Sequence, residues 1–273
     1  MSVRVASVAL AAALATACGG SSAEPPATSQ SPSPAETSQP PSPTVESPSG
    51  APATTIAIPP VDGPYDWTID PADFVATVDN PYFPLEPGTT YVFAGTSEGE
   101  REVVTVRVTD RSKVIQGVTC VVVRDTVRTG GEVTEDTFDW YAQDVDGNVW
   151  YMGEDTKEYD HGEVVSTEGS WEGGVHGALP GVIMPADPTV GLAYTQEHYA
   201  GQAEDKGKIV ALGRQVSVPF GSFDDVLITE DWTPLEQNVL ERKSYAPGIG
   251  VVFEELVKGG QEVLRLVEVR TGA

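Results

Sequence analysis

One pentapeptide matches the motif that presents the nucleophile of serine hydrolases. Residues Gly95-Thr96-Ser97-Glu98-Gly99 have the pattern Gly-x-Ser-x-Gly. In those enzymes a strand precedes the serine and a helix follows it, so that the hydroxyl lies on a sharp turn beside an oxyanion hole. Here both flanking segments have the alternation of strands. We therefore expect a hairpin loop at this position and no catalytic serine.

A second possible chemistry is zinc binding by histidines and an acid. His176 lies in a glycine-rich segment, and Glu197 and His198 lie on an expected strand. Two imidazoles and one carboxylate form a common zinc ligand set, so His176, His198 and Glu197 are the candidate metal ligands. Their spacing matches no metal motif, and surface or hydrogen-bonded histidines are the alternative. The sequence predicts no cofactor.

Aromatic residues are the candidates for ligand binding. They could stack on a sugar or line an apolar cavity, although filling the core and pairing across strands is their more common role. The candidates are Trp140, Trp150, Tyr151, Trp171 and Tyr194. Paired carboxylates could also act on glycosides, but with 41 acids in the chain some pair will lie at that separation by chance. No residue is predicted to be catalytic.

Cys18 follows a segment with the composition of a bacterial lipoprotein signal peptide. Arg4 precedes an uncharged apolar run over residues 5–17, which ends in small residues directly before the cysteine. Such a run is typical of a signal peptide and is shorter than the ~20 residues of a transmembrane helix. We predict that residues 1–17 are removed and that Cys18 carries a thioether-linked diacylglycerol and acyl chains such as palmitate. The alternative is a chance cysteine at an ordinary cleavage site.

The charge balance limits the possible partners. The chain has 16 Lys and Arg against 41 Asp and Glu, a formal net charge of −25 at pH 7. Without the signal peptide, which contains Arg4, the balance is 15 minus 41, or −26. This net charge opposes binding to nucleic acid and to anionic lipid. The predicted partners are a membrane, held through the lipid anchor, and an unknown ligand or envelope partner.

Composition divides the chain into a tether and a folded part. Residues 18–64 are rich in Pro, Ser and Thr, and they contain too few apolar side chains to offset the entropy of ordering. We predict a disordered tether there, followed by a single β-domain over residues 65–273. The predicted location is the bacterial cell envelope, at the outer face of the cell membrane or in the periplasm.

After residue 88 the pattern acquires the two-residue period of β-strands. Glycine turn signals recur about every ten residues, and no long helical pattern occurs. We predict an all-β fold, an antiparallel meander of about eleven strands that curls into a barrel or half-barrel because twist accumulates. One short N-terminal helix is expected, with Asp70 as its N-cap and Pro71 at its first position.

One predicted hairpin carries several of the candidate aromatic residues. Its turn is Asp146-Gly147, which joins a strand containing Trp140-Tyr141 to one containing Trp150-Tyr151. Asp-Gly is a strong signal for a two-residue hairpin turn. The same turn explains the acidic run over residues 144–148 better than a calcium loop, which needs glycine at its sixth position and helices at its flanks.

A second hairpin is predicted around Gly259-Gly260. A two-residue loop there sets Glu254 opposite Arg265 and Phe253 opposite Leu266. Opposite charges and apolar pairs facing each other across strands favour this register.

The stretch from Gly169 to Gly191 interrupts the expected strands with many Gly and Pro residues. Loops of this length in compact domains often cover pockets or carry function. We therefore expect one long Gly/Pro-rich loop, and we expect any site to border it.

Four segments stand out as characteristic motifs. They are Asp79–Gly88, Asp139–Tyr151, Gly169–Val175 and Tyr245–Gly250. Together they resemble a family of secreted bacterial lipoproteins of unknown activity, and the resemblance spans nearly all of residues 75–255. It implies a single domain and supplies no activity, so no catalytic role carries over to this chain.

The leading hypothesis is a lipid-anchored, non-enzymatic envelope protein. It would bind a small molecule, a lipid or a partner on the concave face of its sheet, as curved β-folds commonly do. A secreted hydrolase or metal-dependent enzyme with a site near the 169–191 loop is the first alternative. A structural envelope protein without a ligand is the second.

Overall fold

The computed structural model describes residues 56–65 and 67–272. Within them the chain forms sixteen strands and one turn of 3-10 helix, so the fold is nearly all β. The predicted signal peptide, Cys18 and the predicted tether as far as residue 55 lie outside the described residues.

The strands differ widely in length. The long strands are β2 (Thr90–Ser97), β3 (Glu100–Ile115), β4 (Val118–Thr129), β5 (Glu132–Asp144), β6 (Val149–Asp160), β9 (Leu179–Met184), β12 (Lys206–Val218), β13 (Gly221–Trp232), β14 (Leu240–Ala246), β15 (Gly250–Lys258) and β16 (Glu262–Arg270). The short strands are β1 (Phe74–Val75), β7 (Glu163–Ser166), β8 (Trp171–Glu172), β10 (Ala193–Thr195) and β11 (Glu197–His198). The predicted number of about eleven strands is too low. The short strands lie in segments with too few residues for a periodic signal.

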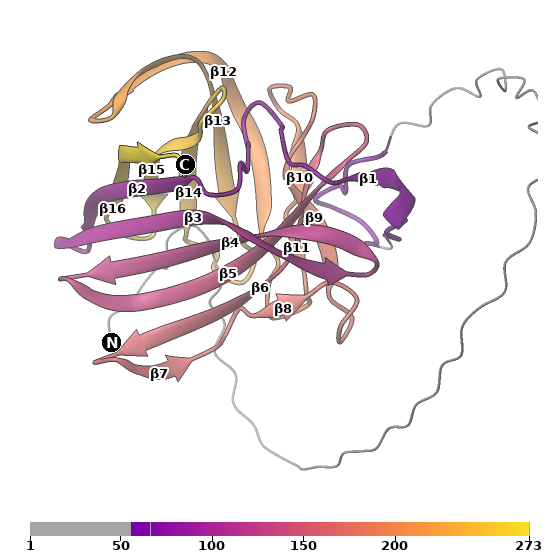
Figure 1. Ribbon diagram of the computed structural model, residues 1–273, viewed down its shortest axis with the longest axis horizontal. Helices are drawn as coiled ribbons and strands as arrows, with labels where there is room; N and C mark the ends of the chain where they lie inside the picture. Colours follow the sequence, from indigo (N-terminus) through magenta and orange to yellow (C-terminus); the bar gives the residue numbers. More distant parts are fainter. Residues whose placement is uncertain (1–55, 66, 273) are drawn as a thin grey trace, which may run out of the picture. The chain divides into compact units, whose positions relative to one another are not determined.

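The sheet consists of two antiparallel meanders joined side by side. Strands β2 to β6 form one meander and β12 to β16 form the other. Strand β16 pairs with β2, which brings the last strand of the chain against the first long one. Figure 1 shows the first meander in purple to pink and the second in orange to yellow.

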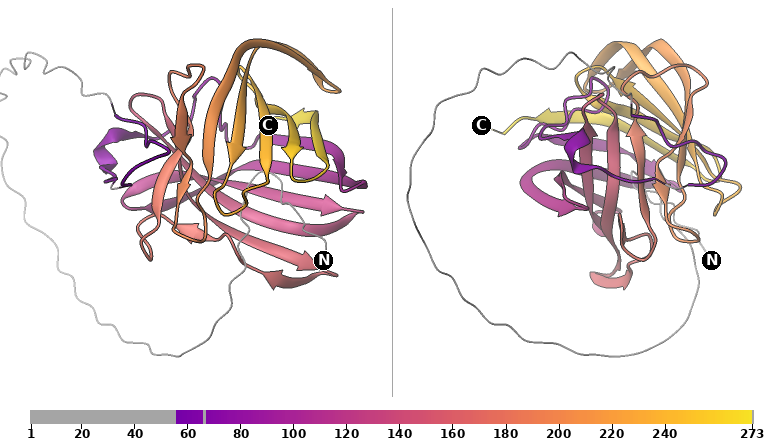
Figure 2. Two further views of the ribbon diagram at one scale, coloured as in Figure 1. Left: turned by 180° about the vertical axis from the view of Figure 1, so that it is seen from behind. Right: turned by 90° about the vertical axis from the view of Figure 1, so that its right-hand side faces the viewer.

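A short segment brings the two edges of this sheet together. Strand β10 pairs with β12 at one edge, and β11 pairs with β9 at the other. Only Gln196 separates β10 from β11 in sequence, so the sheet is nearly closed into a barrel (Figure 2). The close approach requires glycine at position 181, where a Cβ atom would lie 2.4 Å from the carbonyl oxygen of Gln196. The predicted all-β, antiparallel, curled fold is confirmed.

The predicted short helix is also present. The 3-10 helix η1 covers Pro71–Asp73, and Asp70 Oδ1 accepts a hydrogen bond of 3.0 Å from the backbone N–H of Ala72. Proline at the first position and an aspartate cap are the features that predicted it.

The prediction of one long loop over residues 169–191 is wrong in part. The segment contains β8 and β9, and both pair with β6. Strand β9 includes the apolar run Val182-Ile183-Met184, in which Val182 and Met184 are fully buried. Burial of this run outweighs the turn-forming tendency of the neighbouring Gly and Pro residues.

The hairpin between β5 and β6 joins the two predicted strands, but the predicted two-residue turn is wrong. The backbone N–H of Asp144 donates to the carbonyl of Asn148, so residues 145–147 form a longer loop. Tyr141 lies opposite Tyr151, and Ala142 lies opposite Trp150. Asp144 completes the turn, because its Oδ1 atom accepts from the backbone N–H groups of Asp146 and Asn148 at 3.0 and 2.9 Å.

The predicted register of the β15–β16 hairpin is wrong by one residue. Phe253 lies opposite Arg265, and Glu254 lies opposite Leu264. Glu254 and Leu264 both point into the buried side of the sheet, whereas the Arg265 guanidinium lies 5.2 Å from the centre of the Phe253 ring on the other side. The alternation of buried and exposed positions sets the register here, and not the pairing of opposite charges.

The core has two apolar clusters. The larger includes Trp150, Met152, Met184 and Tyr194, and the smaller includes Leu264 with other residues of β2, β3, β15 and β16. In the larger cluster Trp67 and Phe74 pack on Trp150, so residues before β2 cover part of the sheet.

Candidate functional site

The described fold buries an unusual number of carboxylates. Charged side chains are almost never fully buried unless they are paired. Twelve acids are nevertheless buried: Glu102, Asp125, Glu135, Asp139, Asp144, Glu154, Glu197, Asp205, Asp231, Glu241, Glu254 and Glu262. Among the described Lys and Arg residues, only Lys243 is buried with them.

Strand alternation directs most of these acids into the interior. Glu262 shares a face of β16 with Leu264, and Glu102 shares a face of β3 with Val104 and Val108. An acid at an apolar position of a two-residue pattern is the signal that identifies such sites in a sequence. The candidate list drawn from the sequence contains only Glu197 of the twelve.

Lys243 lies among three of these acids. Its Nζ atom is 3.0 Å from Glu241 Oε2 and 3.4 Å from Asp231 Oδ2. Lys243 on β14 also lies directly opposite Glu254 on β15. Burial alone would lower the pKa of this ammonium, but the neighbouring acids outweigh burial and hold the pKa well above its ordinary value. Lys243 is therefore charged and offsets one of the surrounding negative charges.

Several of the buried acids, Glu135, Asp139 and Glu154 among them, hold protons more tightly than ordinary carboxyl groups. Burial, followed by repulsion from Asp139 and other acids, raises the pKa of Glu135 to about 8 despite a hydrogen bond from Thr137. Burial raises the pKa of Asp139 to about 7 against the hydrogen bond from Tyr151. The pKa of Glu154 is raised well above its ordinary range, first by burial and then by Asp139, which lies directly opposite on β5.

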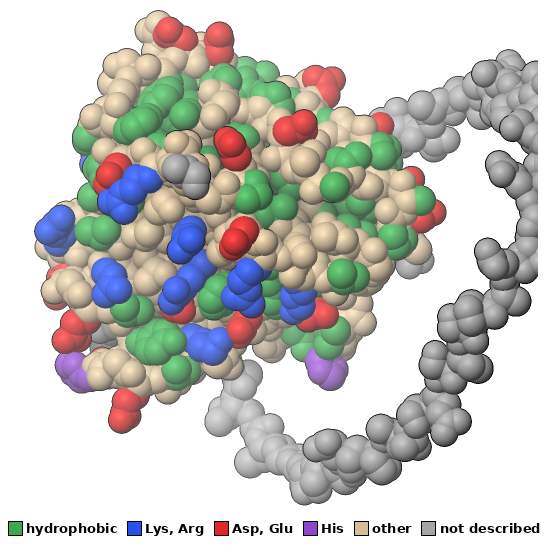
Figure 3. Space-filling view, in the orientation of Figure 1, with side chains coloured by type: hydrophobic (Ala, Val, Ile, Leu, Met, Phe, Trp, Pro, Cys, Tyr) green, Lys and Arg blue, Asp and Glu red, His purple; other side chains and the backbone are tan. Residues whose placement is uncertain are grey.

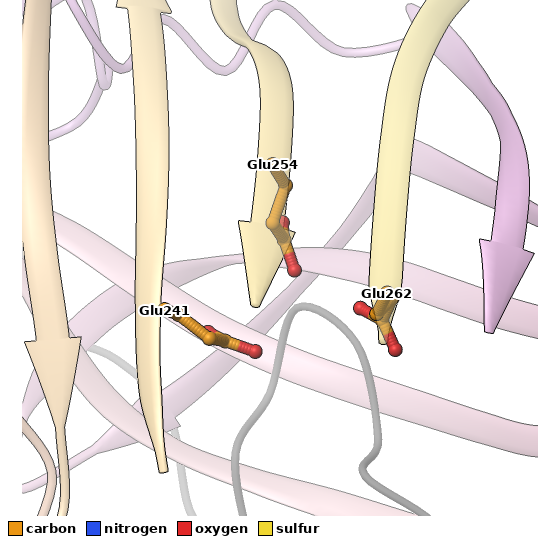
Figure 4. Close-up of side chains that lie close together, drawn as sticks. All are labelled: Glu241, Glu254 and Glu262. Carbon is orange, nitrogen blue, oxygen red and sulfur yellow. The ribbon is translucent and has the colours of Figure 1, made fainter. Parts of the chain in front are cut away.

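Three of the acids converge on one point. Glu241 of β14, Glu254 of β15 and Glu262 of β16 each place a carboxylate oxygen within 4.8 Å of the other two. Figure 4 shows the three side chains extending from adjacent strands toward one another. All three are at most 2% exposed. In the described part of the chain this is the one group of three or more His, Cys, Asp or Glu residues with the geometry of a metal site.

A separate open pocket of about 350 Å³ borders β5, β6 and β8. Its aromatic wall is formed by Trp140, Trp171 and Tyr199. The ammonium of Lys113 lies 3.2 Å from the centre of the Trp140 ring and pairs with Glu172 Oε2 at 2.6 Å. The remaining lining residues are Glu154, Asp155, Ser170, Val175 and His176. The pocket therefore combines aromatic surface with charged and hydrogen-bonding groups.

A second cavity is smaller and apolar. It has a volume of about 70 Å³ and is lined by residues such as Phe83, Tyr91, Phe93 and Val251. Sites for small organic ligands usually measure ~300–1,000 Å³. This cavity is too small for an acyl chain or a sugar, whereas the pocket beside Trp140 falls within the usual range.

Comparisons with known proteins leave the function open. No family model and no curated protein matches the chain. The fold is similar to the crystal structure of a candidate lipoprotein from Parabacteroides distasonis, with 12% sequence identity and a TM-score of 0.37. The match covers 69% of this chain and 98% of the other. A likeness this distant assigns neither a family nor an activity.

The predicted ligand-binding aromatics divide into two groups. Trp140 and Trp171 contribute to the wall of the pocket, although both are largely buried. Trp150, Tyr151 and Tyr194 lie in the core with their polar atoms bonded, to Asp144 at 2.8 Å, Asp139 at 2.5 Å and the carbonyl of Ile183 at 3.4 Å respectively. The residues of the second group therefore fill the core and form hydrogen bonds within it.

The three predicted metal ligands do not share a centre. His176 is exposed at the edge of the pocket. His198 stacks on Tyr65 with ring centres 4.3 Å apart. Glu197 precedes it on β11 and is buried, so the two side chains point to opposite faces of the strand.

Ser97 lies in a hairpin, as the sequence predicted, and the one described cysteine is buried. Ser97 lies at the end of β2 in a tight turn to β3, and its hydroxyl donates to Glu262 Oε2 at 3.3 Å. Strands flank it on both sides, so the Gly-x-Ser-x-Gly match is a hairpin. Cys120 of β4 is a free, fully buried thiol, and burial is the main cause that raises its pKa to about 12.

The surface charge is uneven despite the acidic net charge. Figure 3 shows Lys and Arg side chains gathered on one face, over the region of β3 and β4. Exposed arginines on those strands are Arg101, Arg107, Arg111, Arg124 and Arg128. Arg107 and Arg124 lie directly opposite each other. The acidic excess is therefore concentrated elsewhere on the surface and in the interior.

No helix in the described residues has both the length and the apolar character needed to cross a membrane.

Proposed function

We propose that this protein is a lipid-anchored, non-enzymatic binding protein of the bacterial cell envelope, and that it holds a small polar molecule in the pocket beside Trp140. The anchor is Cys18, which the signal-like segment before it presents for acylation. A thioether-linked lipid with two or more acyl chains retains a protein on a bilayer stably.

The observation that carries the binding function is the size and lining of the pocket. A volume of about 350 Å³ suits a small organic ligand. The segment after Gly169 contributes Ser170, Trp171, Glu172 and His176 to its wall, so the site borders the stretch that the sequence singled out.

The lining favours a polar ligand over a lipid. Five lining residues have acidic or basic side chains of the Asp, Glu, Lys or His type, namely Lys113, Glu154, Asp155, Glu172 and His176. An acyl chain in this pocket would remove these charged groups from water without offering them a hydrogen bond, which costs free energy. A small molecule with hydroxyl or amino groups would satisfy them, while Tyr199 supplies an aromatic face for its apolar part.

Native mass spectrometry of protein purified from its own host tests the proposal. The wild-type chain should carry a bound mass that denaturation releases. Because a hydrogen bond to a charged group contributes ~1.5–3 kcal/mol, Glu172→Gln and His176→Asn should each lower occupancy roughly tenfold or more.

His161→Asn is the matched control for the second variant. His161 and His176 are both exposed and both have positive φ, 51° and 53°, a conformation that Asn tolerates. His161 lies outside the pocket, so its replacement should leave the bound mass unchanged. The proposal fails if the wild-type protein carries no ligand, or if the two histidine variants behave alike.

A further inference from the structure

We propose that Glu241, Glu254 and Glu262 bind one hard divalent cation, and that calcium is the preferred ion. The site is distinct from the pocket beside Trp140, because its residues come from β14, β15 and β16 whereas the pocket is formed mainly around β5, β6 and β8.

The separation of the carboxylates matches a single ion. Calcium lies ~2.3–2.6 Å from its oxygen ligands, so two ligands on opposite sides of one ion are up to about 5 Å apart. The oxygens of the three glutamates lie within 4.8 Å of one another. Every pair of them can therefore reach the same ion without a change of strand positions.

Unpartnered oxygens give an independent reason for a ligand. Glu254 is 2% exposed, and its Oε1 atom is buried without a hydrogen-bond partner. Neither oxygen of Glu241 accepts a hydrogen bond, although Lys243 lies 3.0 Å from Oε2 without hydrogen-bond geometry. Buried charges are normally paired or bound to a metal. Both side chains extend toward the common centre in Figure 4.

The neighbouring charge does not neutralise the group. When all three glutamates are ionised they carry a charge of −3, and Asp231 is a fourth acid beside Lys243. The single ammonium of Lys243 leaves an excess of negative charge in a buried environment. A divalent cation removes most of this excess, and it also supplies the missing partners of Glu241 and Glu254.

The chemistry of the carboxylate ligands and the burial of their oxygens favour calcium over other ions. Oxygen-only carboxylate ligands suit calcium, magnesium and manganese and do not favour zinc or copper. Magnesium usually keeps several of its water molecules, but the unpartnered oxygens of Glu241 and Glu254 are buried away from solvent. Three carboxylates that bind through both oxygens supply six ligands, which reaches the lower end of the calcium range.

Metal analysis of the purified full-length chain is the direct test. After exhaustive dialysis against EDTA and then into metal-free buffer, the wild type should take up about one calcium per chain. Calcium should also raise its thermal midpoint, and magnesium should do so less at equal concentration. The absence of uptake and of any change in midpoint up to millimolar calcium would overturn the proposal.

Glutamine substitutions test whether the ion binds at these three glutamates. Glu254→Gln and Glu262→Gln should each abolish uptake and the calcium-dependent rise in midpoint, while circular dichroism verifies that they fold. Glu135→Gln also removes a buried acid, but one outside the group, and it should retain both responses. Equal calcium responses in Glu254→Gln and the wild type would place the ion elsewhere and contradict the assignment. A proton-sharing cluster without an ion would show neither uptake nor a shift in any variant.

Discussion

The ammonium of Lys243 lies 3.0 Å from Oε2 of Glu241, and both side chains are buried inside the sheet. This pair is surrounded by acids, because Asp231 Oδ2 is 3.4 Å from the same ammonium and Glu254 lies opposite Lys243 on the next strand. The relationship makes Lys243 the counter-charge of a group that would otherwise contain only carboxylates. Its removal is therefore a sensitive test of how the interior is stabilised.

Lys243→Met should lower the free energy of unfolding by roughly 3–5 kcal/mol at pH 8, because it leaves buried carboxylates without their cation. The loss should be smaller at pH 5, because burial raises the pKa values of Asp231 and Glu254 and so favours their protonated, uncharged forms as the pH falls. Urea denaturation at the two pH values measures both effects.

Lys157→Met is the control for this variant. Lys157 pairs with Asp155 at 2.9 Å on the partly exposed side of β6, and such pairs contribute ~0–1 kcal/mol. Equal losses in the two lysine variants would show that the buried acids do not depend on Lys243.

Stability should fall as pH rises from about 5 to 9. The folded-state pKa is about 8 for Glu135 and about 7 for Asp139, both above the ordinary range near 4. The folded chain therefore holds protons that the unfolded chain has lost. Their contribution is complete below the unfolded pKa and is lost as pH passes through the folded pKa. Because one pKa unit corresponds to ~1.4 kcal/mol, we expect a loss of a few kcal/mol.

Urea denaturation across this pH range, in EDTA, measures the slope. Glu135→Gln should flatten it, since the amide cannot ionise. Glu163→Gln, at an exposed position of β7, should leave the slope unchanged. A wild-type profile that is flat or rises with pH would contradict the raised pKa values.

Cys18→Ser should move the protein from the membrane fraction to the soluble fraction, because serine cannot form the thioether that carries the lipid. Cys120→Ala is the control. Cys120 is buried on β4, so its replacement should leave the protein on the membrane with its acyl label. Metabolic labelling with palmitate and fractionation of cells expressing each variant measure the outcome, and a membrane-bound, labelled Cys18→Ser protein would refute the anchor.

Local signals predict the parts of the fold that depend on adjacent residues. Asp70 and Pro71 predict the helix, and Asp146-Gly147 predicts the first hairpin, because each turn or cap is determined by its own side chains. The β15–β16 register depends on which residues face the interior. Glu254 faces inward despite its charge, so a rule that pairs opposite charges chooses the wrong partner.

The candidate sites also differ in whether adjacent residues or the pairing of distant strands bring their side chains together. Trp140, Trp171 and His176 do line the pocket, since the segment after Gly169 folds against β5 and β6. Glu241, Glu254 and Glu262 carry no spacing motif, because they meet only when three strands pair laterally. Which side chains meet across neighbouring strands depends on how the strands pair. The spacing of residues in a single sequence does not predict that pairing.

Gly95 and Ser97 of the Gly-x-Ser-x-Gly match have different structural roles. At Gly95 a Cβ atom would lie 1.7 Å from the carbonyl oxygen of Val263 on β16. Gly95→Ala should therefore disrupt the contact between β2 and β16 and destabilise the fold by several kcal/mol. Ser97→Ala loses one long hydrogen bond to Glu262 and should cost ~1 kcal/mol or less.

Thermal unfolding of both variants, together with hydrolysis of a p-nitrophenyl ester, checks this prediction. We expect a large fall in thermal midpoint for Gly95→Ala and a small one for Ser97→Ala. Ester hydrolysis by Ser97→Ala should equal the wild-type background. Loss of a wild-type esterase activity in Ser97→Ala, with its midpoint preserved, would instead identify a nucleophilic serine. The glycine of the motif is thus required by the close approach of two strands, which is a reason unrelated to catalysis.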